Sequence, residues 1–226
     1  MLKQLLQKLL VKFGKSYTLD DNISNKLVIS FLVNRTVMML RGLIKTRRKI
    51  FLGSKVRILN KSNFYFGKGC TIERHVVIDC HASQEIKLGD VVKIGAFTTI
   101  STTSHLSKYG KGLQIGNNSA VGEYSYFGCS GGVRIGNDVI MGQYISFHSE
   151  NHNFSDTKLL IREQGVTSKG IELGNNIWVG SKATFLDGSK VGNNSVVAAG
   201  SVVKDEFPDN VVIGGVPAKI LKHLNG

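Results

Sequence analysis

The chain has 226 residues, of which 42% are hydrophobic and 20% are charged, and its mean hydropathy is +0.00. This composition suits a soluble protein with one sizeable core, with or without a small appendage, and excludes a disordered low-complexity chain. The net charge of +13 is uneven, since residues 1–57 hold 13 Lys and Arg against two acids. Residues 58–226 hold 16 against 14, which excludes a nucleic-acid groove along the whole molecule and favours a local anionic partner such as a membrane surface.

Residues 1–55 are predicted to form a basic, amphipathic helical segment. Apolar side chains recur there at helical spacing, with Lys and Gln on the other face. The apolar positions are Leu2, Leu5, Leu6, Leu9, Leu10 and Phe13. The unbroken apolar stretch and small-residue cleavage site of a secretory signal are both missing, so a signal peptide is not expected.

A second apolar stretch covers residues 27–44. Arg35 near its middle would cost about 3 kcal/mol in a spanning helix, so a transmembrane segment is not expected. A basic cluster follows directly and would attract anionic headgroups by about 1 kcal/mol per charge. The cluster comprises Lys45, Arg47, Arg48 and Lys49. Two interpretations stay open for residues 1–50: a peripheral membrane anchor, or helices that cap the next domain or pack on a neighbouring subunit.

Between residues 88 and 203 an aliphatic or aromatic residue recurs every six positions, often with glycine after it. The spacing holds without a slip through Leu173, Val179, Phe185, Val191, Val197 and Val203. This period fits neither a helix nor a flat sheet and is typical of a hexapeptide β-helix, in which each short strand sends one side chain into a central core. The sequence therefore predicts a β-helix over residues 56–207. A tail over residues 208–226 should hold a short strand and then a helix after Pro217.

The failures of the repeat locate its insertions. Three strands make one coil of 18 residues, as from Leu173 to Val191, but residues 88–115 contain nine too many and residues 135–173 contain 20 too many. The larger surplus must leave the coil as a protruding loop over residues 148–169, and such excursions usually carry function. At other corners a pair of Asn or Asp residues follows the glycine, and these residues tolerate a left-handed backbone.

The 148–169 loop contains His152, which is the predicted general base because an imidazole can take a proton from a hydroxyl near neutral pH. His148 is a weaker candidate for a supporting role, and His105 sits in the smaller insertion. Glu150 and Asp156 are candidates to orient the imidazole, although a backbone carbonyl would serve equally well. The three cysteines, Cys70, Cys80 and Cys129, show no metal-site spacing and are expected to be reduced core thiols of a cytoplasmic protein.

Three motifs resemble those of the hexapeptide-repeat acyltransferases, in the branch of galactoside, maltose and surface-polysaccharide O-acetyltransferases. They are Asn151-His152-Asn153-Phe154, then Gly174-Asn175-Asn176-Ile177-Trp178-Val179-Gly180-Ser181, and then the segments 199–204 and 214–222. The resemblance covers residues 56–222. It implies an all-β, left-handed parallel β-helix and a homotrimer that binds acetyl-CoA between adjacent subunits, with His152 deprotonating the acceptor.

The resemblance also implies the residues that contact acetyl-CoA. Backbone amides near Ser181 and Ala199 would line the pantetheine arm, and three lysines would lie near the CoA phosphates. The full set is Trp178, Gly180, Ser181, Ala199, Gly200, Lys204, Lys219 and Lys222. Ordinary packing equally explains Trp178, and solvation equally explains the lysines.

The function implied is acetyl transfer from acetyl-CoA to a sugar hydroxyl of a surface polysaccharide or its lipid-linked precursor. The expected location is the cytoplasm, and attachment to the inner face of the cell membrane stays open with the interpretation of residues 1–50. Three alternatives stay open: an N-acyltransferase acting on a nucleotide-linked amino sugar, a zinc enzyme resembling β-helix carbonic anhydrases, and a scaffold without activity. The zinc site would need three His ligands from neighbouring coils, which the spacing does not offer, so no metal is expected.

Overall fold

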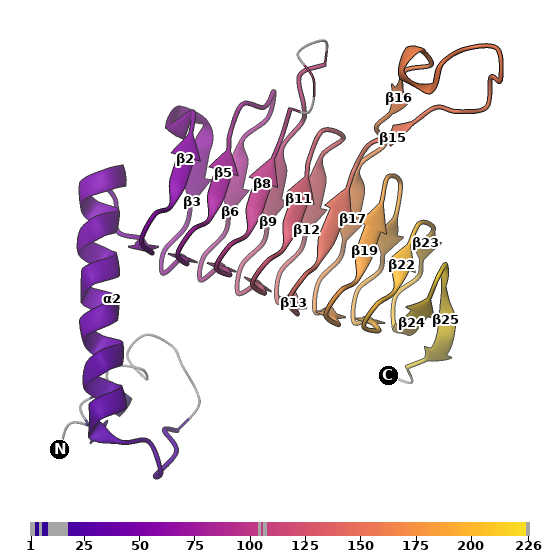
Figure 1. The fold of residues 1–226 in the computed structure, drawn as a ribbon. Helices are drawn as coiled ribbons and strands as arrows, with labels where there is room; N and C mark the ends of the chain where they lie inside the picture. The colour runs from indigo at the N-terminus through magenta and orange to yellow at the C-terminus, as the bar shows by residue number, and fades with distance from the viewer. Residues whose placement is uncertain (1–2, 5, 9–17, 104, 106–107, 225–226) are drawn as a thin grey trace. The chain divides into compact units, whose positions relative to one another are not determined.

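The computed structural model describes residues 3–4, 6–8, 18–103, 105 and 108–224 (Figure 1). Two compact units divide the chain, Met1–Phe51 and Leu52–Gly226. Of the predicted N-terminal amphipathic helix, residues 3–4 and 6–8 are helical, while most of its apolar positions lie outside the described residues.

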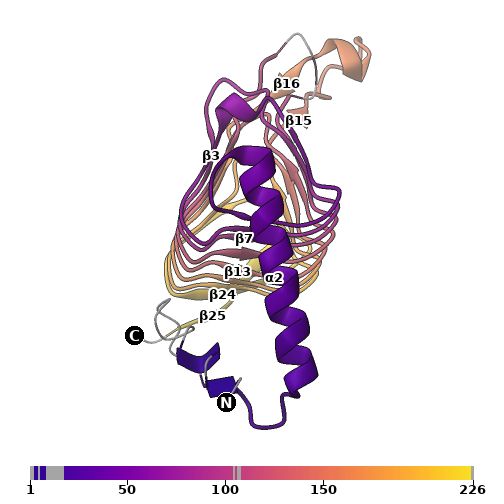
Figure 2. The ribbon, with the colours of Figure 1, turned by 90° about the vertical axis from the view of Figure 1, so that its left-hand side faces the viewer.

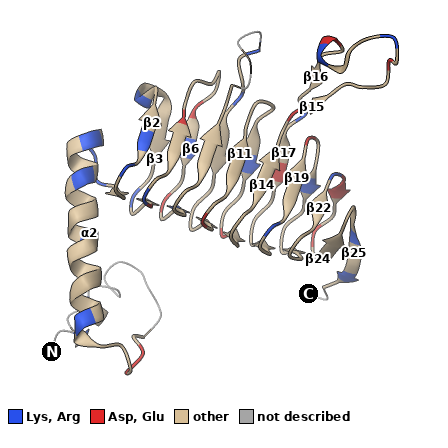
Figure 3. Cartoon of the chain, viewed as in Figure 1, with Lys and Arg blue, Asp and Glu red and all other residues tan. Residues whose placement is uncertain are grey.

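Helix α2 (Asn25–Thr46) accounts for 22 residues of the first unit. The hydroxyl of Ser24 caps its start by accepting the Leu27 N–H at 3.2 Å, and Arg47 ends it in a left-handed conformation with its N–H donated to the Leu43 carbonyl. Figure 3 shows Lys and Arg near both ends of this helix. The predicted apolar stretch is therefore one continuous helix.

The two sides of α2 differ. Val28, Met38 and Gly42 are buried, and the Arg35 guanidinium lies 3.3 Å from the centroid of the Phe51 ring. The other side exposes a stripe of apolar residues at helical spacing: Ile29, Val33, Val37, Leu40 and Ile44. By length and composition alone, α2 could cross a membrane, a test that soluble core helices and signal sequences also pass.

The second unit is a stack of coils with three parallel faces, seen end-on in Figure 2. Face A holds β1 (Phe51–Leu52), β4 (Thr71–Ile72), β7 (Lys93–Ile94), β10 (Ala120–Val121), β13 (Ile140–Met141), β18 (Trp178–Val179), β21 (Val196–Val197) and β24 (Val211–Gly215). Face B holds β2 (Arg57–Leu59), β5 (Val77–Asp79), β8 (Thr99–Ser101), β11 (Tyr126–Gly128), β14 (Ser146–His148), β19 (Thr184–Leu186) and β22 (Val202–Val203). Face C holds β3 (Phe64–Phe66), β6 (Ile86–Leu88), β9 (Leu113–Ile115), β12 (Val133–Ile135), β17 (Ile171–Leu173), β20 (Lys190–Val191) and β23 (Glu206–Phe207).

The chain passes from face A to B to C and back to A, turning at corners that we name AB, BC and CA after the faces they join. A short 3₁₀ helix, η1 (Lys61–Asn63), occupies corner BC of the first coil. The predicted parallel β-helix is confirmed, although its first strand, β1, begins at Phe51 rather than at residue 56, and β24 extends face A to Gly215.

The six-residue pattern fills the core, because the repeated residue of each strand points inward, and face C strands such as β6 and β12 bury a second side chain as well. On face B the column includes Phe127, Phe147 and Phe185, each fully buried, with successive ring centroids 4.6 and 4.7 Å apart. The three cysteines are also buried and unpaired by disulfides. Burial, together with the nearby Asp79 carboxylate, raises the pKa of the Cys80 thiol to about 12.

The Gly-Asn pairs of the sequence lie at corner CA, where their side chains form hydrogen bonds between successive coils. Each first Asn accepts, on its side-chain oxygen, the backbone N–H of its counterpart one coil earlier: Asn137 accepts from Asn117 at 2.7 Å, and Asn175 accepts from Asn137 at 2.8 Å. The second residue of each pair is the left-handed one, with φ of 55° at Asn118. The glycine before the pair is required by space, since a Cβ at Gly136 would lie 2.7 Å from the Asn175 Oδ1.

Gly136→Ala is therefore expected to lower the free energy of unfolding by about 1–3 kcal/mol, because the added methyl group must displace backbone and the Asn ladder. Urea denaturation followed by circular dichroism measures the loss. Asn118→Gly is the matched control: its left-handed backbone suits glycine, so the change should stay below about 0.5 kcal/mol. Equal stability of the Gly136→Ala variant and the wild type would contradict the steric account.

The prediction of a C-terminal helix is wrong. Residues after Pro217 form strand β25 (Ala218–His223), which folds back antiparallel on β24 and pairs Lys219 with Gly214 and Lys222 with Val212. β24 already pairs with β21 on one side and presents an open edge on the other. Hydrogen bonding to that edge outweighs the local helical preference of the Ala-Lys-Ile-Leu-Lys run, which is worth only tenths of a kcal/mol per residue.

Candidate active site

The 20-residue surplus leaves corner BC as an ordered hairpin that projects from the coils (Figure 1). Strands β15 (Asn151–His152) and β16 (Val166–Thr167) pair antiparallel, with His152 opposite Val166. Asn153 continues the pairing: its N–H donates to the Gly165 carbonyl at 3.0 Å and its side-chain amide to the Gln164 carbonyl at 2.9 Å. The hairpin therefore presents the exposed His152 from a hydrogen-bonded strand.

The outer part of the hairpin is held together by Gln164, beside the short 3₁₀ helix η2 (Ile161–Glu163). The Gln164 side chain accepts the Asp156 N–H at 3.0 Å and donates to the Asp156 and Leu159 carbonyls. The Asp156 carboxylate accepts the Lys158 N–H at 2.8 Å, so it caps this turn. The Glu150 carboxylate, at the root of the hairpin, accepts a hydrogen bond from the Ser168 hydroxyl at 3.3 Å.

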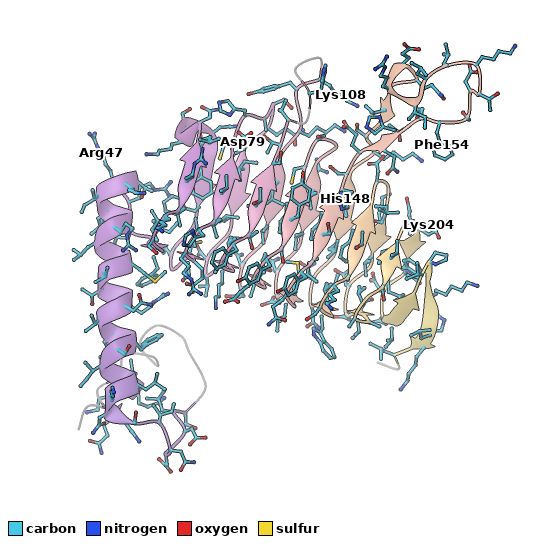
Figure 4. All side chains as sticks on the ribbon, viewed as in Figure 1. Arg47, Asp79, Lys108, His148, Phe154 and Lys204 are labelled. Carbon is cyan, nitrogen blue, oxygen red and sulfur yellow. The ribbon has the colours of Figure 1, made fainter. Side chains whose placement is uncertain are left out.

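The other candidate histidines lie apart from the hairpin strands. His148 ends β14 on the outer side of face B (Figure 4), where its Nε2 lies 2.7 Å from the Ser146 Oγ and its ring 5.7 Å from the Tyr126 ring. His105 is exposed in the smaller insertion, in a β-bridge with Lys108.

Five of the eight predicted acetyl-CoA contacts gather at one edge of the coil stack. Trp178 points outward from face A and is 61% exposed, beside the equally exposed Ile140 of the neighbouring strand. Gly180 and Ser181 form corner AB of that coil, and Ala199 and Gly200 form the same corner of the next. A Cβ at Gly180 would lie 2.5 Å from the Ala199 amide nitrogen, so this corner needs glycine to let the coils approach.

The three lysines are divided. Lys219 and Lys222 lie exposed on β25, in the sheet of face A. Lys204 follows β22 at corner BC and forms a 3.4 Å ion pair with Asp205. The structure therefore places Trp178 and the corner AB residues together and leaves His152 and Lys204 on a different corner.

One column of residues at corner AB escaped sequence reasoning. His75, Phe97, Tyr124 and Tyr144 all have positive φ and stack with ring centroids 4.8, 4.9 and 5.2 Å apart. Their signal was present, because each of the last three stands two residues after a repeat glycine. The stack runs along the same corner, AB, that holds Ser181 in the coil after Tyr144.

A shallow groove of about 170 Å³ lies where corner BC meets face C. Its lining includes Lys111, Arg134, Lys169 and Glu172 and none of the predicted site residues. Within the described part of the chain, no group of three or more His, Cys, Asp or Glu residues could hold a metal ion.

Comparison with known proteins places these motifs in a family. Residues 170–205 match the family model described as bacterial transferase hexapeptide (six repeats). WbbJ of Escherichia coli K12, named for O-acetyl transfer in lipopolysaccharide biosynthesis, is 30% identical over 142 residues, which cover 59% of this chain and 72% of WbbJ. A Mycobacterium tuberculosis protein named as an acetyltransferase is 25% identical over 74% of this chain, and the match spans about half of that protein, 52%.

Among solved structures, the hexapeptide-repeat acetyltransferase VCA0836 of Vibrio cholerae, complexed with acetyl coenzyme A, has a TM-score of 0.51 at 18% identity. That likeness covers 92% of this chain and 94% of the other, and it supports the left-handed β-helical fold. Together, the coil architecture, the motif order and the match over 72% of WbbJ show that this chain belongs to the hexapeptide-repeat acyltransferases.

Proposed function

We propose that this protein transfers an acetyl group from acetyl-CoA to a saccharide hydroxyl, with His152 as the general base. The observation that carries the proposal is the position of His152, which stands exposed on an ordered hairpin at the largest interruption of the coils. The imidazole takes the hydroxyl proton while the oxygen attacks the thioester carbonyl carbon. The C–S bond then breaks, the imidazolium returns the proton to the CoA thiolate, and an acetyl ester and free CoA leave.

The site is proposed to form between copies of the chain. His152 lies at corner BC, whereas five of the predicted acetyl-CoA contacts lie at face A and corner AB. We call these five the acetyl-CoA strip: Trp178, Gly180, Ser181, Ala199 and Gly200. The base and the acetyl-CoA strip therefore occupy different edges of one coil stack. A homotrimer would bring the hairpin of one subunit over the corner AB strip of the next. The exposed Ile140 and Trp178 side chains on face A provide apolar surface for such a contact.

The acceptor class is tested by incubating the wild-type protein with acetyl-CoA and a panel of acceptors: neutral saccharides, a lipid-linked oligosaccharide and a nucleotide-linked amino sugar. Released CoA thiol is measured, and the product, separated from acetyl-CoA, is treated with alkaline hydroxylamine, which cleaves acetyl esters and spares amides. Hydroxylamine-labile product on a hydroxyl acceptor supports the proposal. A stable amide formed on the amino sugar alone would replace it with N-acylation.

The first unit is proposed to hold the protein at the cytoplasmic face of the membrane, where a lipid-linked glycan would be modified. The exposed apolar stripe of α2 would enter the interface, and the basic cluster after the helix would meet anionic headgroups. Arg35 lies on the opposite side of α2, against Phe51, and so does not interrupt the stripe.

Removing three charges from this cluster, at Arg47, Arg48 and Lys49, by substitution with Gln should weaken flotation with anionic vesicles about 100-fold at low salt, at about 1 kcal/mol per charge. Binding to zwitterionic vesicles should change little. The control removes the same charge from exposed positions of the second unit: Lys61, Lys68 and Lys87. Equal flotation of both triple variants with anionic vesicles would show that the basic cluster does not bind the membrane.

A further inference from the structure

The two insertions of the coil stack leave from the same corner, BC, and touch one another. Residues 103–112 leave between β8 and β9, and the His152 hairpin leaves two coils later, between β14 and β17. We propose that Lys108, in the smaller insertion, is a positioning residue that holds the hairpin, and thereby His152, where the acetyl transfer proposed above requires it. The inference rests on that proposed function and assigns a role to an insertion that the mechanism does not otherwise use.

The contact is a short relay of hydrogen bonds. The Lys108 Nζ donates to the Ser168 Oγ at 2.5 Å, and the Ser168 hydroxyl donates to the Glu150 carboxylate at 3.3 Å. Both bonds are partly buried, so they are less exposed to competing water than ordinary surface contacts. A cation and an anion on two different insertions are therefore joined through one hydroxyl.

The hydrogen-bond relay reaches the hairpin at its root, on the side where His152 lies. Asn151 pairs with Thr167 and His152 with Val166, so Glu150 and Ser168 occupy the next cross-strand position. Side chains two residues apart on a strand point to the same side. By this alternation Glu150, which directly precedes β15, lies on the same side of the hairpin as His152, and the link to Lys108 acts on that side.

The corner between the two insertions fixes their roots to the coil stack. Lys111 donates its N–H to the Ser130 carbonyl at 3.0 Å, and the Gly131 N–H donates to the Ser149 Oγ at 2.9 Å. Glycine at 131 leaves room for the Ser149 carbonyl, which a Cβ would strike. Since both roots are anchored, the Lys108–Ser168 bond closes a rigid connection instead of tying together two freely moving loops.

The hairpin needs such a connection because an isolated two-stranded ribbon is marginally stable in water, and β15 and β16 pair over only two residues each. A general base must lie about 3 Å from the oxygen whose proton it takes, and a misplacement of about 1 Å can cost about 100-fold in rate. Small tilts of this hairpin would therefore change kcat, while the acetyl-CoA strip at corner AB would keep its geometry.

The test compares full-length Lys108→Met, Lys108→Arg and Ser168→Ala with the wild type. Lys108→Met and Ser168→Ala should each lower kcat about tenfold with the KM for acetyl-CoA unchanged, and the double variant should be little worse than either single one. Lys108→Arg keeps the cation and should recover most of the activity. Lys111→Met removes a positive charge from the same corner, at a side chain that lines the shallow groove, and should behave as the wild type.

Hydrogen exchange of the backbone provides a readout independent of activity. In Lys108→Met the amides of residues 151–153 and 165–167 should exchange about tenfold faster, while those of the coils stay unchanged. An active wild type with kcat and hairpin exchange unaltered in Lys108→Met overturns the proposal, as does faster exchange without a fall in kcat. A wild type that transfers no acetyl group to any acceptor overturns the proposed function instead, and faster hairpin exchange in the variant would still support the structural link.

Discussion

His152→Ala is expected to lower kcat for acetyl transfer by about 10²–10⁴-fold, the range for loss of a general base, and to leave the dissociation constant for acetyl-CoA within about twofold. The base acts on the acceptor hydroxyl, and five of the eight predicted acetyl-CoA contacts lie at face A and corner AB, away from His152, so binding and chemistry should separate. The initial rate of CoA release at saturating substrates gives kcat, and calorimetric titration gives the dissociation constant for acetyl-CoA.

His81→Ala is the matched control, because His81 is also exposed at corner BC, where its ring Nδ1 lies 2.6 Å from the neighbouring Asp79 carboxylate. It should retain wild-type kcat. Acetyl transfer by His152→Ala at the wild-type rate would exclude His152 as the base. Equal losses in both variants would instead indicate a general effect of removing an imidazole from this corner.

Phe147→Ala is expected to lower the free energy of unfolding by about 3–5 kcal/mol, the usual cost of emptying a buried aromatic site. Phe147 is fully buried between the rings of Phe127 and Phe185, and the coils above and below hold those rings in register. The cavity cannot collapse without breaking the strand ladder of face B. Urea denaturation followed by circular dichroism measures the loss.

Two variants separate the cavity from the ring stack itself. Phe147→Leu keeps most of the volume and should cost less than about 1.5 kcal/mol. Tyr144→Ala removes a stacked ring from corner AB, where Tyr144 is 54% exposed, and should cost less than about 1 kcal/mol. A larger loss in Tyr144→Ala than in Phe147→Ala would mean that the exposed column, and not the core, stabilises the coils.

The sequence predicted the coils well because their determinants are local and periodic. The apolar residue of each hexad, such as Val179 or Phe185, by itself predicts a buried position, and each Asn-Asn pair predicts a turn with a left-handed residue. Counting coil lengths then located the hairpin that carries His152. No comparable local rule reveals that β15 and β16 pair, since neither strand is apolar or alternating.

The features that sequence reasoning missed depend on partners distant in the chain. The tail after Pro217 reads as a helix by itself and becomes a strand only because β24 offers an open edge. Lys108 and Ser168 are separated by 60 residues, and their contact arises from two insertions that happen to share corner BC.

The side-chain ladder at corner CA has a consequence for how such chains change length during evolution. The same hydrogen bond recurs from Asp90 through the asparagines to Asp209. In each coil the side-chain oxygen accepts from the coil before it, and the backbone N–H of the same residue donates to the coil after it. Duplicating or deleting one complete coil rejoins identical parts, whereas gaining a single residue within a strand breaks the ladder. Lineages of this architecture should therefore lengthen and shorten by whole coils, with smaller changes confined to corners such as BC.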